Sequence, residues 1–158
     1  MIDQRAYNDK PIPVPEGSPL PYISRRALKR VRDPLDPPTS CDRCCGEHVR
    51  LVSNNEVYGR QFGDWPFLYL CDWCGAYVGL HPNTDIPLGT MADKETREAR
   101  KRGKSAFFRM VKENDLSRDD GYKWLADELG IPSSECHWGW FDKFRCKEAE
   151  RICLSRCF

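Results

Sequence analysis

Apolar residues follow two different periodicities along this chain. Beyond residue 90 they recur at a period near 3.6, the repeat of an amphipathic helix. We expect one helix to begin at the N-cap Thr90, a second to run between Ser117 and Gly130, and a last one to cover residues 142–157. Gly103 costs about 1 kcal/mol relative to alanine inside the first helix, so a break can occur there. The apolar residues predicted to face inward around the last helix are Phe141, Phe144, Ala149, Ile152 and Cys153.

The middle of the chain shows short apolar runs of strand length instead. Residues 48–52 and 56–60 flank the turn signal Asn54-Asn55, so we expect them to pair as an antiparallel hairpin. Two further runs, residues 66–70 and 76–80, lead into and out of a Cys-Asp-Trp-Cys motif. This pattern predicts a small sheet.

The first 40 residues have neither periodicity. They carry eight of the chain's twelve prolines: Pro11, Pro13, Pro15, Pro19, Pro21, Pro34, Pro37 and Pro38. Proline fixes its own φ and lacks an N–H donor, so no helix or central strand runs through such a segment. Residues 22–32 interrupt the prolines with a run that suits a short helix and that holds five cations and no acid. We therefore predict an irregular N-terminal arm.

Composition narrows the class of protein. Mean hydropathy is −0.68, and no apolar run approaches the roughly 20 residues of a membrane-spanning helix. The first residues contain no apolar core of a secretory signal, so we expect a soluble protein of the cytoplasm, with no membrane partner. A net charge of +1 excludes the strong positive field of a DNA-coating protein. Contacts with nucleic acid would have to come from local patches.

Nine cysteines predict a metal site, because disulfides rarely persist in a reducing compartment. A Cys-Asp-Arg-Cys motif is followed, after 26 residues, by the Cys-Asp-Trp-Cys motif. Two such turns supply the four thiolates that Zn²⁺ prefers in a tetrahedron, and the spacer suits a strand hairpin. The pattern is typical of a zinc ribbon, in which the metal builds structure and activates no water. The predicted ligands are Cys41, Cys44, Cys71 and Cys74.

Two alternatives stay open at this stage. Cys45 directly follows Cys44 and precedes Gly46, and a glycine often follows the second cysteine of such a turn. In that register Cys45 would be the ligand, although Cys44 gives the tighter turn. Near the C-terminus a second metal would draw on Cys136, Cys146, Cys153 and Cys157. The competing interpretation is that these are buried thiols of the core.

The patterns together predict an α+β protein in three parts. Residues 1–40 form the proline-rich N-terminal arm, residues 41–89 a zinc-ribbon module, and residues 90–158 a helical region packed on the ribbon. Zn²⁺ is the only cofactor that we expect.

The run Cys-Asp-Trp-Cys-Gly-Ala-Tyr-Val-Gly-Leu-His-Pro-Asn-Thr, from Cys71 onward, resembles a zinc-finger-containing domain family, DUF3268, found in bacteriophage and bacterial genomes. A later stretch, from Ser117 to Cys146, is also similar to that family. The resemblance implies a zinc-binding phage or prophage protein and no particular activity. The chain departs from the family pattern in two places. The first knuckle holds an apparent extra residue before Gly46, and residues 104–108 lack the histidine that the family tends to carry there, which argues against catalysis.

Three classes of function fit these features. The first is non-catalytic nucleic-acid binding, with phosphates contacted by Arg25, Arg26, Arg30, Arg100, Lys101, Arg102 and Lys104. The aromatic residues that would stack on bases, or else fill the core, are Tyr58, Phe62, Trp65 and Trp73. The alternative is a protein-interaction module that binds or inhibits a host protein. A metal-dependent nuclease has the least support, since no spacing joins its candidates His81, Asp85, His137 and Asp142.

Overall fold

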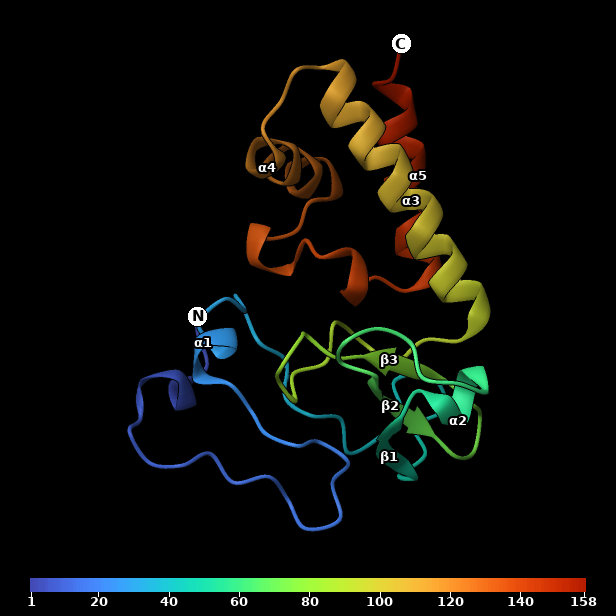
Figure 1. Ribbon diagram of the computed structural model, residues 1–158. Coiled ribbons are helices and arrows are strands. Elements are labelled where there is room, and N and C mark those ends of the chain that lie inside the picture. Colours follow the sequence, from blue (N-terminus) through green and yellow to red (C-terminus); the bar gives the residue numbers. More distant parts are fainter. The chain divides into compact units, whose positions relative to one another are not determined.

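The computed structural model describes residues 1–158, and the chain divides into two units, Met1–Met91 and Ala92–Phe158 (Figure 1). The first unit holds all three strands and the second is helical. The protein is thus a small α+β fold, and each unit has a hydrophobic core of its own. None of the helices combines the length and the apolar character that crossing a membrane requires.

A three-stranded antiparallel sheet forms the centre of the first unit. Its strands are β1 (Val49–Ser53), β2 (Phe67–Cys71) and β3 (Tyr77–Gly79), in the order β1-β2-β3. Tyr69 in the central strand is paired with Leu51 on one side and Val78 on the other. The strand β2 ends at Cys71, so the sheet delivers the chain directly to the second cysteine motif.

Residues 1–40 contribute to the core of this unit despite their prolines. They contain a 3-10 helix (Gln4–Tyr7) and the short helix α1 (Arg25–Leu28), which Ser24 caps through its hydroxyl. The expected short helix within residues 22–32 is therefore present. The buried side chains that this stretch supplies are Ala6, Leu20, Ile23, Leu28 and Val31.

The predicted hairpin between residues 48–52 and 56–60 is wrong. The second segment forms a turn of helix, α2 (Asn55–Tyr58), which Gly59 ends at a φ of 77°. The Asn54 side chain accepts a hydrogen bond from the Phe62 amide (3.1 Å) and donates one to the Phe62 carbonyl (3.0 Å). This pair of bonds closes a loop, and β1 pairs with β2 instead.

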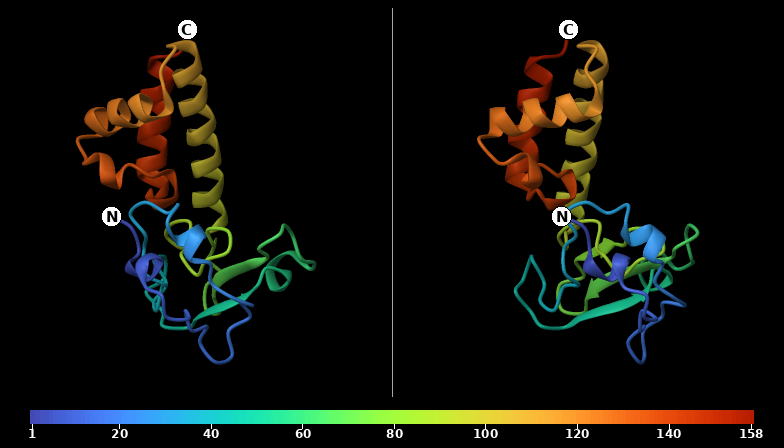
Figure 2. Two further views of the ribbon diagram at one scale, coloured as in Figure 1. Left: turned by 60° about the vertical axis from the view of Figure 1, so that its left-hand side comes forward. Right: turned by 90° about the vertical axis from the view of Figure 1, so that its left-hand side faces the viewer.

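Three helices build the second unit: α3 (Lys94–Glu113), α4 (Arg118–Leu129) and α5 (Lys143–Ser155). Short 3-10 helices at Ser133–Glu135 and Trp138–Trp140 join α4 to α5. The helices α3 and α5 run side by side along much of their length (Figure 2). Both helices contribute small and aromatic side chains to the core of this unit, including Ala99, Phe107, Cys146 and Ala149.

The sequence places two helix starts correctly and one wrongly. Ser117 caps α4, as its position predicts, and the last helix begins where expected, with Asp142 as its cap. The long helix is capped by Asp93, whose carboxylate accepts from the Thr96 amide at 2.9 Å, and not by Thr90. Phe144 was expected to face inward but is 71% exposed. It lies two residues before buried Cys146, which is about 200° around the helix, so it must face outward.

Candidate metal centre

Two turns of the first unit have the same backbone hydrogen bonds. In the first, residues 41–46, the Cys45 amide donates to the Cys41 carbonyl at 2.9 Å; in the second, residues 71–76, the Gly75 amide donates to the Cys71 carbonyl at 3.0 Å. The Cys41 amide donates to the Gly46 carbonyl and the Cys71 amide to the Ala76 carbonyl, both at 2.9 Å. The two motifs therefore fold as equivalent knuckles.

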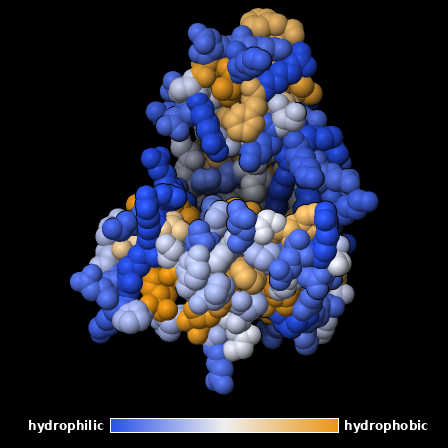
Figure 3. Space-filling view, in the orientation of Figure 1, coloured by the Kyte–Doolittle hydropathy of each residue, from blue (hydrophilic) through white to orange (hydrophobic).

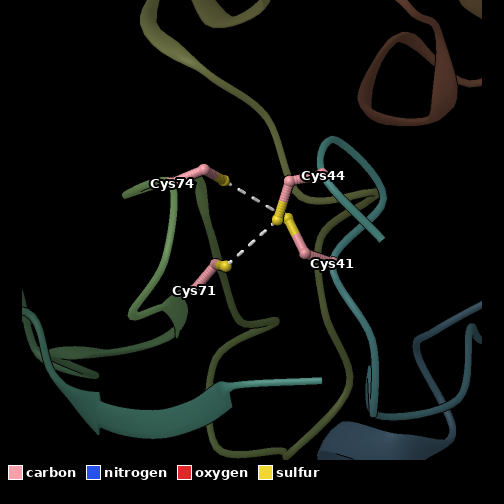
Figure 4. Close-up of side chains that lie close together, drawn as sticks. All are labelled: Cys41, Cys44, Cys71 and Cys74. Atoms are coloured by element: carbon pink, nitrogen blue, oxygen red, sulfur yellow. Dashed lines mark hydrogen bonds between the residues drawn. The ribbon is translucent and has the colours of Figure 1, made fainter. Parts of the chain in front are cut away.

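The knuckles bring four sulfur atoms together (Figure 4). The Sγ atoms of Cys41, Cys44, Cys71 and Cys74 all lie within 4.8 Å of one another. Two of the distances, Cys41–Cys74 and Cys44–Cys71, are 3.6 Å. Sulfurs at 2.3 Å from a tetrahedral Zn²⁺ would be about 3.8 Å apart, so the cluster has the dimensions of a metal site. Cys41 and Cys71 are buried, while Cys44 and Cys74 lie nearer the surface.

The environments of the thiols differ in a way that suits metal binding. Burial raises the pKa of Cys41 to about 12. Burial opposes ionisation of Cys74 too, but the Ala76 amide and the neighbouring thiols outweigh it and lower its pKa to about 7. The Gly46 amide donates to the Cys44 sulfur at 3.4 Å and lowers the pKa of that thiol, although desolvation and the neighbouring thiols leave it above its ordinary value. Backbone donors thus stabilise negative sulfur in both knuckles, as a cation held by thiolates requires.

The donor set fits a zinc ion that supports structure. Four thiolates fill the tetrahedron of Zn²⁺, so no coordination position is left for a water or a substrate. A bound ion would cross-link the two knuckles, one before the sheet and one at the end of β2. A carboxylate also ties the first knuckle to a distant segment, because Asp42 accepts a hydrogen bond from the Met91 amide at 2.7 Å.

The geometry separates the roles of Cys44 and Cys45. Cys45 is exposed and adopts a left-handed φ of 61°, matching Gly75, whose φ is 76°. Cys45 therefore stands in the position that glycine occupies in the second knuckle, and its thiol is not part of the cluster. The sequence interpretation that the first knuckle has an extra residue before Gly46 is wrong, since Gly46 matches Ala76.

The C-terminal thiols are not gathered in this way. Cys136, Cys146 and Cys153 are buried in the core of the helical unit and Cys157 is half-buried. Cys146 donates to the Phe141 carbonyl at 3.8 Å and Cys157 to the Cys153 carbonyl at 3.4 Å. Burial raises the pKa of Cys146 to about 11 and that of Cys153 to about 12. These four residues form no cluster with the dimensions of a metal site.

The candidates for acid–base catalysis lie in separate units, and both carboxylates have structural partners. In the first unit, the His81 carbonyl accepts from Thr84, and Asp85 accepts two hydrogen bonds from the Arg5 guanidinium at 2.8 and 2.9 Å. In the second unit, Asp142 caps α5.

The basic residues singled out in the sequence differ in their surroundings. Arg26, Arg30, Lys101, Arg102 and Lys104 are exposed, and Arg102 lies 4.0 Å from the Glu150 carboxylate. Arg25 is half-buried, and Arg100 is half-buried with its Nε donating to the Phe141 carbonyl at 3.0 Å. Arg100 therefore also holds the helical unit together.

Two arrangements in the first unit were not foreseen. Arg5 bridges Asp3 and Asp85, and His48 stacks on Trp73 with ring centroids 4.4 Å apart. Asp85 is 80 residues from Arg5, so no local pattern signals that contact. The order of charged residues along the sequence does not show which distant carboxylate an arginine will bind.

The family comparison agrees with this geometry. The model of the DUF3268 family, described as a zinc-finger-containing domain, matches residues 37–156, about three quarters of the chain. No curated protein and no solved structure matches the chain. The matched region contains both knuckles, all three strands and the helices α3 to α5. The chain therefore belongs to the DUF3268 family of zinc-finger-containing domains.

Proposed function

We propose that this protein binds nucleic acid without catalysis, with a Zn²⁺ ion holding its ribbon together. The observation that carries the proposal is the distribution of cations outside the metal centre. Although the net charge is only +1, two segments contain no acid at all. One is residues 25–32, around α1, and the other is residues 101–112, within α3.

The cations of the first segment are available to a ligand. Arg26, Lys29, Arg30 and Arg32 are exposed, and none of them forms a salt bridge. Lys29 lies over the ring of Tyr7, with its Nζ 5.6 Å from the centroid. Cations without a salt-bridge partner can bind phosphates, and an exposed tyrosine ring beside them can stack on a base.

The second segment lines an open groove on the helical unit. Lys101, Arg102 and Arg109 of α3 border a hollow of about 420 Å³, together with Leu154 of α5. Two acids are close: Glu150 lies in the groove, and Glu113 pairs with Arg109 at 2.9 Å. Lys101 and Lys104 are exposed and have no carboxylate within salt-bridge distance. We expect the phosphate backbone of a nucleic acid to bind along this groove.

A salt titration tests the proposal. Fluorescence anisotropy with labelled single-stranded and duplex oligonucleotides, at several salt concentrations, should show that the logarithm of the association constant falls linearly with the logarithm of the salt concentration. The slope falls by about 0.7 to 0.9 for each phosphate contact removed. Replacing Arg26, Lys29 and Arg30 by glutamine, or Lys101, Arg102 and Lys104 by glutamine, should therefore reduce both affinity and slope.

Lys123→Gln provides the matched control, since this exposed lysine lies on α4 among Asp119, Asp120 and Asp127. It should leave binding unchanged. Wild-type protein that shows no binding to either oligonucleotide at low salt would exclude the proposal.

The alternative is a protein-binding module, and one observation favours it. Phe144 and Leu154, both on α5, are 71% and 46% exposed. The face of the protein that Figure 3 displays is mostly hydrophilic. Exposed apolar side chains are common singly, so they carry less weight than the unpaired cations. A single stoichiometric partner captured from a bacterial lysate, lost with Phe144→Ser, would favour this alternative.

A further inference from the structure

Trp73 is held at the tip of the second knuckle and is 69% exposed. It is the residue between Asp72 and Cys74, so its backbone is fixed by the same turn that positions two metal ligands. Large aromatic side chains are usually buried, because an indole ring removes a large apolar area from water when it packs. The knuckle instead presents this ring to solvent.

The orientation of the ring is fixed by the first knuckle. His48 stacks on the indole with an angle of 26° between the ring planes. Gly46 lies against the same side chain, because a methyl group added there would be only 2.9 Å from Cε3 of Trp73. Both contacts come from residues 46–48, so one side of the ring is covered while most of the side chain stays open. Glycine at position 46 thus leaves the space that the indole ring occupies.

The carboxylate that precedes the ring is ion-paired. Asp72 precedes Trp73, and its carboxylate accepts two hydrogen bonds from Arg50, at 2.6 and 2.8 Å. Arg50 is itself about half exposed. Arg50 also contacts the Glu56 carboxylate at 3.0 Å, so it reduces the negative charge beside the ring without cancelling it. The ring must therefore act by stacking and not by attracting phosphate.

We propose that Trp73, backed by His48, is a stacking platform for one unpaired nucleobase. A flat aromatic face that already carries a ring on its other side can extend the stack by one more ring. A base inside a duplex has both faces covered by its neighbours, so the platform selects single-stranded nucleic acid. This inference rests on the proposed nucleic-acid binding and names the form of nucleic acid that is bound.

The test compares ring variants on single-stranded and duplex oligonucleotides. Trp73→Ala should weaken binding of a labelled single strand about 5- to 150-fold, the range reported for loss of one base–aromatic stack. Its salt slope should stay that of the wild type, because no phosphate contact is lost. Trp73→Phe keeps an aromatic face and should retain most of the affinity. Phe144→Ala, which removes an exposed aromatic ring elsewhere, should have no effect.

The outcomes separate this inference from the proposed function. If the wild type binds with the expected salt dependence and Trp73→Ala binds the single strand equally well, the platform is rejected and the proposed function stands. If Trp73→Ala weakens duplex binding as much as single-strand binding, selection of an unpaired base is rejected. If the wild type binds no oligonucleotide, both proposals fail. Metal content measured on each variant verifies that the knuckles are intact.

Discussion

The indole ring of Trp138 lies directly against the backbone of Gly103, in the middle of α3. A methyl group on Gly103 would be 2.2 Å from Cζ3 and 2.7 Å from Cη2 of that ring. Trp138 is only 4% exposed and belongs to the core of the helical unit. The glycine that seemed to weaken the helix is therefore the place where the connection between α4 and α5 packs onto it.

Gly103→Ala should destabilise the protein although it improves helix propensity. Alanine gains about 1 kcal/mol over glycine inside a helix. Overpacking a buried site costs about 1–3 kcal/mol or more, and a confined indole cannot move aside cheaply. We expect a net loss of about 1–2 kcal/mol in the free energy of unfolding, measured by urea denaturation of the helical signal in circular dichroism.

A double-mutant cycle separates the clash from other effects. Trp138→Leu removes the ring, so Gly103→Ala should be less harmful, or even favourable, in that background. An equal loss of stability from Gly103→Ala with and without the indole would contradict this account.

The metal centre was the part of the structure most fully legible in the sequence. Cys41, Cys44, Cys71 and Cys74 lie in two local motifs, and a turn of four residues leaves little freedom in where its thiols point. The cap Ser117 could be predicted for the same reason, since a cap bonds to an amide three residues on.

Other features depended on contacts that local patterns do not encode. The signal at Asn54-Asn55 is as compatible with the first turn of α2 as with a hairpin, and the bonds from Asn54 to Phe62 decide between them. The left-handed backbone of Cys45 could not be predicted, because cysteine seldom adopts a positive φ. From the sequence, Gly103 would only destabilise its helix; the structure shows that it makes room for Trp138, 35 residues later.

Serine substitutions distinguish the metal ligands from the adjacent thiol. Cys44→Ser removes one of four sulfurs from the cluster, so we expect loss of the bound metal and unfolding of the ribbon, because metal binding and folding are coupled in such modules. Cys45→Ser should retain about one metal ion per chain, since its thiol lies outside the cluster. Elemental analysis of purified protein measures both. Metal retained by Cys44→Ser and lost by Cys45→Ser would reverse the assignment.

Cys45 and Gly75 offer a matched pair for the backbone of the knuckles. Cys45→Gly should stabilise the ribbon by about 0.5–1 kcal/mol, because a non-glycine residue in the left-handed region is strained. Gly75→Ala should destabilise it by about 1 kcal/mol or more; nothing lies within 4 Å of the added methyl, so the effect is conformational. Thermal unfolding at fixed zinc concentration compares the two. Changes of the same sign would show that the knuckles are not equivalent.

Two arginines, each joined to two carboxylates, should differ in their importance because their burial differs. Arg5 joins Asp3 (2.7 Å) and Asp85 (2.8 Å), whose side chains are only 17% and 14% exposed. Arg50 joins Asp72 and Glu56, which are 40% and 45% exposed. Arg5→Met should cost about 1–2 kcal/mol of stability, below the value for a fully buried pair because Arg5 is itself about a third exposed. Arg50→Met should produce no measurable change.

The pH dependence gives the Arg5 effect a signature. The Arg5 guanidinium holds the pKa of Asp3 below its usual value. A carboxyl with a lowered folded pKa stabilises the protein above its unfolded pKa, about 3.9, and that contribution is lost as the pH falls through the folded value. The stability difference between wild type and Arg5→Met should therefore be full at neutral pH and shrink below about pH 4. Acid release of the metal affects both proteins alike and cancels in the comparison. A difference that stays constant down to pH 3 would mean that Arg5 acts through packing and not through its charge.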